Sequence, residues 1–223
     1  MSRTGAGERL RSYHWGAAAW AAAGTLAGVL LFVVVVRNVL GWDFEEASRS
    51  PLAPQHAFGP RYGGWFGSFG VMGWTLAAAI SGLGAEVMRR RGQRQEAVFL
   101  LASTVLSAGL LFDDLFMIHS TIGPQYLGVP KNVMLLLIVA VGVTWGAAFH
   151  RRLLADPDLP ILVWSVGWYA LALWIDAFGE TIGWGGVREE SAKLIGVAAW
   201  LIFFARTTLR LIDQRGPDDA GRF

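Results

Sequence analysis

The chain has 223 residues, 54% of them hydrophobic and only 16% charged, and its formal net charge is +2. Ordinary soluble domains carry about 25% charged residues, so this composition excludes a typical soluble protein. Cysteine is absent, which excludes disulfides, thiolate nucleophiles, Cys-ligated zinc and haem attached through cysteine.

Several long apolar runs predict helices that cross a membrane, because a helix needs roughly 20 apolar residues to span a bilayer. In chain order, the expected spans cover residues 15–40, 64–88, 97–119, 132–149, 161–178 and 189–211. Residues 1–14 and 213–223 are expected to be short polar tails, and residues 15–212 a single transmembrane domain. The predicted fold class is therefore all-α: a polytopic integral membrane protein built as a six-helix transmembrane bundle in the lipid bilayer.

The first two spans are rich in small residues. The first contains Gly24-x-x-x-Gly28, and in the second span glycine recurs at residues 64, 67, 70 and 73. Small residues let membrane helices approach one another closely, so this pattern predicts that the two spans pack tightly together. A second possibility is that the Gly-rich second helix docks on another copy of the chain, giving a homo-oligomer, or on a different membrane protein.

Two adjacent carboxylates, Asp113 and Asp114, lie in the last turns of the third span, and His119 closes it. Ionised groups are costly among apolar membrane residues and are often functional. Neighbouring residues on a helix point about 100° apart, so at least one of the two aspartates is expected to face the bundle. His119 lies about 120–140° around a regular helix from both aspartates, which separates the three side chains if the helix continues to His119.

Further acids are expected at the same depth in the membrane. Asp176 and Glu180 end the fifth span with the i, i+4 spacing that places them on one helix face. The sixth span opens with two more acids and a lysine, and an arginine of the first span lies at the same level. The sequence therefore predicts a polar site that binds a ligand or an ion, built from Asp113, Asp114, Asp176, Glu180, Glu189, Glu190, Lys193 and Arg37.

Basic residues are distributed unequally between the two ends of the expected spans. With both termini on one side, that side carries 13 of the 19 basic residues. Positive charge is enriched in cytoplasmic segments. Both termini are therefore expected inside a bacterial-type cytoplasmic (inner) membrane, with the acidic site near the outer face. Topology explains these arginines, and they give no support for nucleic-acid binding.

Three interpretations of the acidic site remain open. In the first, Arg37 and Lys193 neutralise the carboxylates in a structural ion-pair network. In the second, the site binds or passes a cation, a proton or a small polar ligand, because crowded carboxylates hold protons until a cation replaces them. In the third, His119, Asp113 and Asp114 bind a divalent cation in a metal-dependent membrane enzyme that acts at the outer interface. We favour the second interpretation, and an accessory subunit docked on another membrane protein is a further alternative.

Several tryptophans lie within the expected spans, among them Trp74, Trp145, Trp164, Trp168 and Trp174. Packing in the core is the simpler interpretation of these rings. The alternative is that they line a pocket for an apolar ligand.

Two segments, Phe112-Asp-Asp-Leu-Phe-Met-Ile-His119 and Glu189-Glu-Ser-Ala-Lys-Leu-Ile-Gly-Val-Ala-Ala-Trp200, resemble recurring segments of uncharacterised bacterial multi-span membrane proteins. Those proteins similarly pair an Asp-Asp segment that ends in His with a later acid-x-x-Lys-x-x-Gly segment. The resemblance implies that the two segments belong together, and it implies no activity.

Overall fold

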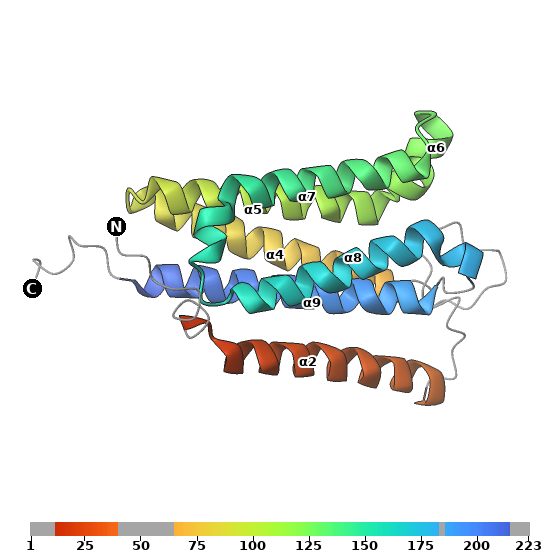
Figure 1. The fold of residues 1–223 in the computed structure, drawn as a ribbon, viewed down its shortest axis with the longest axis horizontal. Coiled ribbons are helices and arrows are strands. Elements are labelled where there is room, and N and C mark those ends of the chain that lie inside the picture. Colours follow the sequence, from red (N-terminus) through yellow and green to blue (C-terminus); the bar gives the residue numbers. More distant parts are fainter. Residues whose placement is uncertain (1–11, 40–64, 183–185, 215–223) are drawn as a thin grey trace, which may run out of the picture.

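The computed structural model describes residues 12–39, 65–182 and 186–214. Within these ranges the chain forms seven α-helices, and six of them are long and apolar enough to cross a membrane. The short seventh helix, α6 (Gly123–Tyr126), precedes α7. The all-helical prediction with six candidate spans is confirmed, which is consistent with a multi-pass membrane protein. The six long helices (Figure 1) are α2 (Trp15–Val34), α4 (Trp65–Arg90), α5 (Arg94–Phe116), α7 (Lys131–Leu154), α8 (Leu159–Ile182) and α9 (Val187–Asp213).

Helix α9 forms the centre of the bundle. It packs against both α4 and α8, and α5 packs on α4. Rings of Phe99, Trp145, Trp200 and Phe204 contact one another where α5, α7 and α9 meet. In α9, 56% of the residues in the apolar segment are buried, against 17% in α2 and 6% in α7. The two helices α2 and α7, which lie at the periphery of the bundle (Figure 1), therefore leave most of their apolar residues exposed.

The elongated bundle (Figure 1) has two ends, which differ in the charged side chains that they hold. Helices α5 and α8 end, and α7 and α9 begin, at the end that holds Asp113 and Asp176; we call it the acidic end. Helices α2 and α8 begin, and α9 ends, at the end that holds Arg206 and Arg210; we call it the arginine end. The start of α2 and the end of α9 therefore lie at the same end of the bundle.

The glycines of α4 pack inside the bundle, but not against α2. A Cβ atom added at Gly73 would lie 2.5 Å from Cγ1 of Val197 in α9, and one added at Gly70 would lie 3.1 Å from a carboxylate oxygen of α5. In α2, a Cβ added at Gly24 or Gly28 would meet no atom within 4 Å. The predicted tight packing of the first two spans through their glycines is therefore wrong, because the α4 glycines admit α9 and α5 instead. Residue 64 lies outside the described ranges, and docking through this helix stays a prediction.

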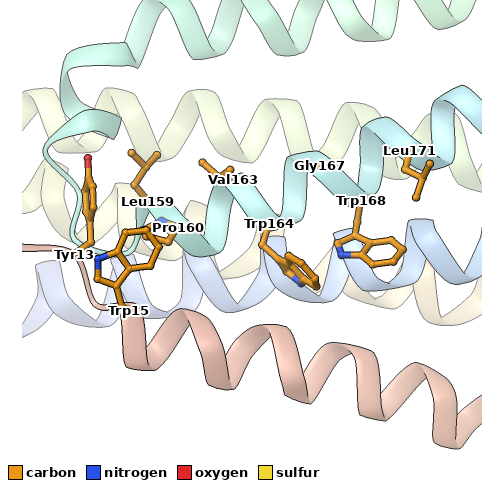
Figure 2. A pocket seen from close by; sticks show the side chains of 9 residues that line it. All are labelled: Tyr13, Trp15, Leu159, Pro160, Val163, Trp164, Gly167, Trp168 and Leu171. Carbon is orange, nitrogen blue, oxygen red and sulfur yellow. The ribbon is translucent and has the colours of Figure 1, made fainter. Parts of the chain in front are cut away.

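Four of the five tryptophans singled out from the sequence line apolar spaces. Trp74 and Trp145 line a cavity between α7 and α8. Trp164 and Trp168 point from α8 towards α2, where they line a pocket of about 430 Å³ (Figure 2). Trp174 is 46% exposed. Both sequence interpretations therefore apply, because Trp74 is at the same time buried in the core and part of a cavity wall.

The third span ends earlier than predicted. Helix α5 stops at Phe116, and Met117 adopts the left-handed backbone conformation with φ 51° and ψ 46°. A π-helical turn, Ile118–Ile122, follows. The expected regular helix up to His119 is therefore wrong. Because a left-handed residue breaks the helical path, His119 folds back towards the last turn of α5.

Candidate functional site at the acidic end

Asp113 contacts His119 in two ways. Only 12% of the Asp113 side chain is exposed. Its Oδ1 accepts a hydrogen bond from the backbone N–H of His119 at 3.0 Å. Its Oδ2 lies 2.7 Å from Nδ1 of the same residue. Both contacts depend on the left-handed Met117, which returns the chain to the carboxylate that the helix has just passed.

The other ring nitrogen of His119 faces α8. Its Nε2 lies 3.4 Å from Oδ2 of Asp176, an ion-pair contact that is not aligned as a hydrogen bond. Lys131, the first residue of α7, donates from Nζ to Oδ1 of Asp176 at 2.6 Å and to its backbone carbonyl at 3.2 Å. A carboxylate, an imidazole, a second carboxylate and an ammonium group thus form a continuous chain that links α5, α8 and α7.

His119 lies outside the candidate spans and is charged at neutral pH. Burial alone would lower the pKa of His119, but the hydrogen bond to Asp113 and the contact with Asp176 outweigh burial and raise the pKa to about 9. In the charged imidazolium both ring nitrogens carry a proton. Each proton then faces a carboxylate.

A second group of ion pairs joins α5 to α9. The Nζ atom of Lys193 donates to Oδ1 of Asp114 and to Oε1 of Glu190, each at 2.9 Å. Only 14% of the Lys193 side chain is exposed, and a buried ammonium group is costly unless it is paired. The contact between Asp114 and Lys193 brings together the two sequence segments that carry the resemblance.

Carboxylates outnumber basic groups among the described residues of the acidic end. Glu189 is repelled by Asp176 and Glu190 and attracted by Lys193. Five carboxylates thus lie with two lysines, one histidine and Arg188, the second residue of α9. The buried Oδ2 atoms of Asp114 and Asp176 have no hydrogen-bond partner among the described residues. Because a buried acceptor without a donor costs free energy, these two oxygens are where a proton or a cation would be stabilised.

A model of a protein family matches most of the chain. It covers residues 24–207 and is described as a domain of unknown function, DUF8692. The chain belongs to the DUF8692 family. The matched range includes every described residue of the acidic end. No curated protein and no solved structure matches the chain.

The structure of this DUF8692 protein brings together most of the predicted site residues. The side chains of the other two are not among those that it describes. Arg37 lies in the π-helical turn Val35–Val39 that follows α2, and Glu180 lies in α8. The side chains of both lie outside the described part of the chain. The side chains that the structure does bring to the acidic end are those of Asp113, Asp114, Asp176, Glu189, Glu190, Lys193 and His119.

Sequence analysis missed Lys131, which belongs to the site. The sequence places it in the short link before the fourth span, where a solvated lysine is the ordinary expectation. In the structure it is the first residue of α7 and pairs with Asp176. Its position in the sequence could have indicated this role. Lys131 directly follows Pro130 and begins an apolar helix, at the same end of the bundle as the acidic residues.

The three predicted ligands of a divalent cation do not converge on one point. Asp113 contacts His119, whereas Asp114 contacts Lys193. In the described ranges, no three side chains of His, Asp or Glu are arranged to hold a metal ion. The geometry of these residues therefore gives the metal-dependent enzyme no support.

An ion-pair network that sequence analysis did not predict lies at the arginine end of this DUF8692 protein. Arg210 donates at 2.7 Å to both Asp156 and Asp158, which are 2% and 1% exposed. Arg206 donates to Asp158 at 3.0 Å, and Nδ1 of His14 lies 3.0 Å from the same oxygen. Burial alone would raise the pKa of Asp158, but the hydrogen bonds with Arg206 and His14 outweigh burial and lower the pKa. Both aspartates are fully paired, which indicates a structural role and leaves the acidic end as the candidate site.

Proposed function

We propose that this DUF8692 protein binds a small cation at the acidic end and releases a proton in exchange. The observation that carries the proposal is the position of His119, a charged imidazole between two carboxylates. Its Nδ1 lies 2.7 Å from Asp113 and its Nε2 lies 3.4 Å from Asp176. A side chain in this position can pass a proton between two acids and responds to any charge placed beside them.

The exchange follows from electrostatics. The two carboxylates keep His119 protonated, because each stabilises the imidazolium. A cation that binds at Oδ2 of Asp176 takes over part of the negative charge that now stabilises the imidazolium. The pKa of His119 then falls towards its ordinary value, and the ring releases its proton. When the cation leaves, the ring takes a proton up again.

We also propose an orientation for the site. The excess of arginine in the segments at the arginine end supports a cytoplasmic location for that end, by the positive-inside rule. The acidic end would then lie near the outer face of a bacterial-type cytoplasmic membrane. Cations would reach it from outside, and both termini would be cytoplasmic.

Proton release on cation addition tests the proposal. The purified full-length chain is placed in weakly buffered detergent solution at about pH 8, below the His119 pKa of about 9. Sodium chloride or calcium chloride is then added, and a pH-indicator dye reports the protons released. Because one imidazolium is involved, we expect up to about one proton per chain with at least one of the two salts. N-methylglucamine chloride at the same ionic strength should release far fewer protons.

The variants separate exchange from a structural network. His119→Gln should abolish the release, and Asp176→Asn is a second variant in case the first does not fold. His150→Gln is the matched control, because among the described residues His150 forms a hydrogen bond with a backbone carbonyl of its own helix and with no carboxylate. Equal release by the wild type and by a folded His119→Gln chain would overturn the proposal, as would release no greater than with N-methylglucamine.

A further inference from the structure

A cavity of about 550 Å³ lies between α7 and α8, with residues of α4, α5 and α9 behind it. This volume lies in the range of about 300–1,000 Å³ that is typical of small-molecule sites. Val143 and Val163 line the cavity and are 64% and 61% exposed, so the cavity reaches the lipid-facing surface. A molecule can therefore enter it from the bilayer.

Glycines keep this space open. Gly142 and Gly146 of α7 and Gly167 of α8 line the cavity, and a Cβ added at any of them would meet no atom within 4 Å. Gly73 and Gly196, by contrast, are glycines at which a Cβ would clash with a neighbouring helix. The glycines of α7 and α8 thus leave room for a ligand rather than bringing two helices into contact.

One polar group in the cavity wall has no partner. Three tryptophans line the cavity, and two of them donate to serines of α5: Trp145 at 3.2 Å and Trp200 at 3.0 Å. The Nε1–H of Trp74 is buried and has no acceptor among the described residues. Trp74 itself is only 2% exposed. Because an unpaired buried donor is costly, this N–H indicates a ligand that carries a hydrogen-bond acceptor.

An unpaired acceptor lies close to this donor. Oδ2 of Asp114 has no hydrogen-bond partner among the described residues, and it lies 3.1 Å from the position of a Cβ at Gly70. Gly70 is one helical turn before Trp74 on α4. Leu110, which lines the cavity, is one turn before Asp114 on α5. The free acceptor of Asp114 therefore lies about one helical turn from two residues of the cavity wall, Trp74 and Leu110.

We propose that this cavity binds a long-chain alcohol from the membrane. The hydrocarbon tail lies between α7 and α8, and the hydroxyl group accepts a hydrogen bond from Trp74. A hydroxyl group is the simplest head group that both accepts and donates a hydrogen bond, so it can also donate to the unpaired Oδ2 of Asp114. The inference rests on the cavity and on Trp74, and it goes beyond the proposed exchange of a cation for a proton at His119.

Binding of hexadecanol, with hexadecane as the matched probe, tests this inference. Radiolabelled probe is incubated with the full-length chain in lipid nanodiscs, and the bound label is counted after gel filtration against nanodiscs without protein. We expect saturable binding of hexadecanol at least tenfold tighter than that of hexadecane. Gly146→Leu should abolish binding because its side chain fills the cavity. Trp74→Phe keeps the ring but removes the N–H, and it should weaken hexadecanol binding several-fold without changing hexadecane binding.

Matched controls use the same substitutions elsewhere in the chain. Gly28→Leu in α2 and Trp168→Phe in the α2–α8 pocket should leave binding unchanged. Asp176→Asn should remove proton release but leave hexadecanol binding intact, which separates a failure of this inference from a failure of the proposed function. Equal binding of the two probes, or hexadecanol binding unchanged by both Gly146→Leu and Gly142→Leu, would overturn the inference.

Discussion

Asp113 and Asp114 are adjacent in the sequence but have different partners. Neighbouring side chains on a helix point about 100° apart, which directs Asp113 to His119 and Asp114 to Lys193 of α9. Substituting one aspartate therefore perturbs one ion-pair group and leaves the other in place. The two residues can be tested separately even though they are neighbours.

The raised pKa of His119 makes stability depend on pH in the alkaline range. The imidazolium is favoured in the folded state, where the pKa is about 9, over the unfolded state, where it is 6.5. Its contribution is therefore fully present below 6.5 and is lost as the pH rises through about 9. We expect the free energy of unfolding to fall by roughly 3 kcal/mol over this interval. Thermal unfolding in detergent from about pH 6 to about pH 10 measures this fall in stability.

The variant His119→Gln should lack this alkaline step, because glutamine does not titrate. Asp113→Asn should move the step to lower pH, since the imidazolium loses its nearest carboxylate. His150→Gln should keep the step, because His150 is exposed and has no carboxylate partner among the described residues. An alkaline step of the same size in the His119→Gln chain would show that another group causes it.

At the arginine end, Asp158 should contribute to stability in the acid range. The variant Asp158→Asn removes a counter-charge from both Arg206 and Arg210, of which Arg210 still pairs with Asp156. We expect a loss of about 3 kcal/mol, at the lower limit for breaking a buried ion pair, because Arg206 is partly exposed. Since the folded pKa of Asp158 lies below 3.8, the contribution is present above 3.8 and is lost as the pH falls through the folded value. Thermal unfolding near neutral pH measures this loss of stability. The control variant is Asp213→Asn, which alters an exposed aspartate at the same end and should change the stability little.

At the scale of helices, Gly73 sets the distance between α4 and α9. A Cβ at this position would lie 2.5 Å from Cγ1 of Val197, so Gly73→Ala should destabilise the bundle by about 1–3 kcal/mol through overpacking. Val197→Ala removes the clashing methyl group, so the double variant should recover part of the loss. Gly142→Ala is the control, because its Cβ meets nothing within 4 Å, and alanine is a better helix former than glycine. Equal unfolding temperatures for Gly73→Ala and Gly142→Ala would contradict this role.

The sequence predicts the helices well because the signal for a membrane span lies within the span. Length and apolar composition locate all six long helices, and the acids at the helix ends identify the end that holds the site. Contacts between helices are less predictable, because glycine spacing shows that a helix can be approached closely without showing by which partner. The α4 glycines admit α9 and α5, whereas those of α2 meet no helix. The left-handed Met117 was also not predictable, since it is not a glycine and nothing nearby marks a break.

For the whole molecule, the two ends differ in how their charges are paired. At the arginine end, the buried carboxylates of Asp156 and Asp158 each accept several charged hydrogen bonds. At the acidic end, carboxylates exceed basic groups among the described residues, and two buried carboxylate oxygens have no hydrogen-bond partner among them. Carboxylates whose oxygens are all paired fix the helices, whereas carboxylates with unpaired oxygens can respond to an added charge. The sequence indicates where the charges concentrate, but the pairing depends on side-chain contacts between helices that are distant in the sequence.

The absence of cysteine allows a direct test of how the bundle crosses the membrane. Arg94 is the first residue of α5, and Gln125 lies in α6 at the opposite end of the bundle; both are exposed. Single variants Arg94→Cys and Gln125→Cys are treated with a membrane-impermeant maleimide in intact cells and again after lysis. Because the arginine-rich segments are expected inside, Gln125→Cys should react in intact cells and Arg94→Cys only after lysis. Leu136→Cys, on the exposed apolar face of α7, should react in neither case. The reverse pattern would overturn the orientation, and labelling of Arg94→Cys and Gln125→Cys from the same side would overturn the membrane-spanning arrangement of α5.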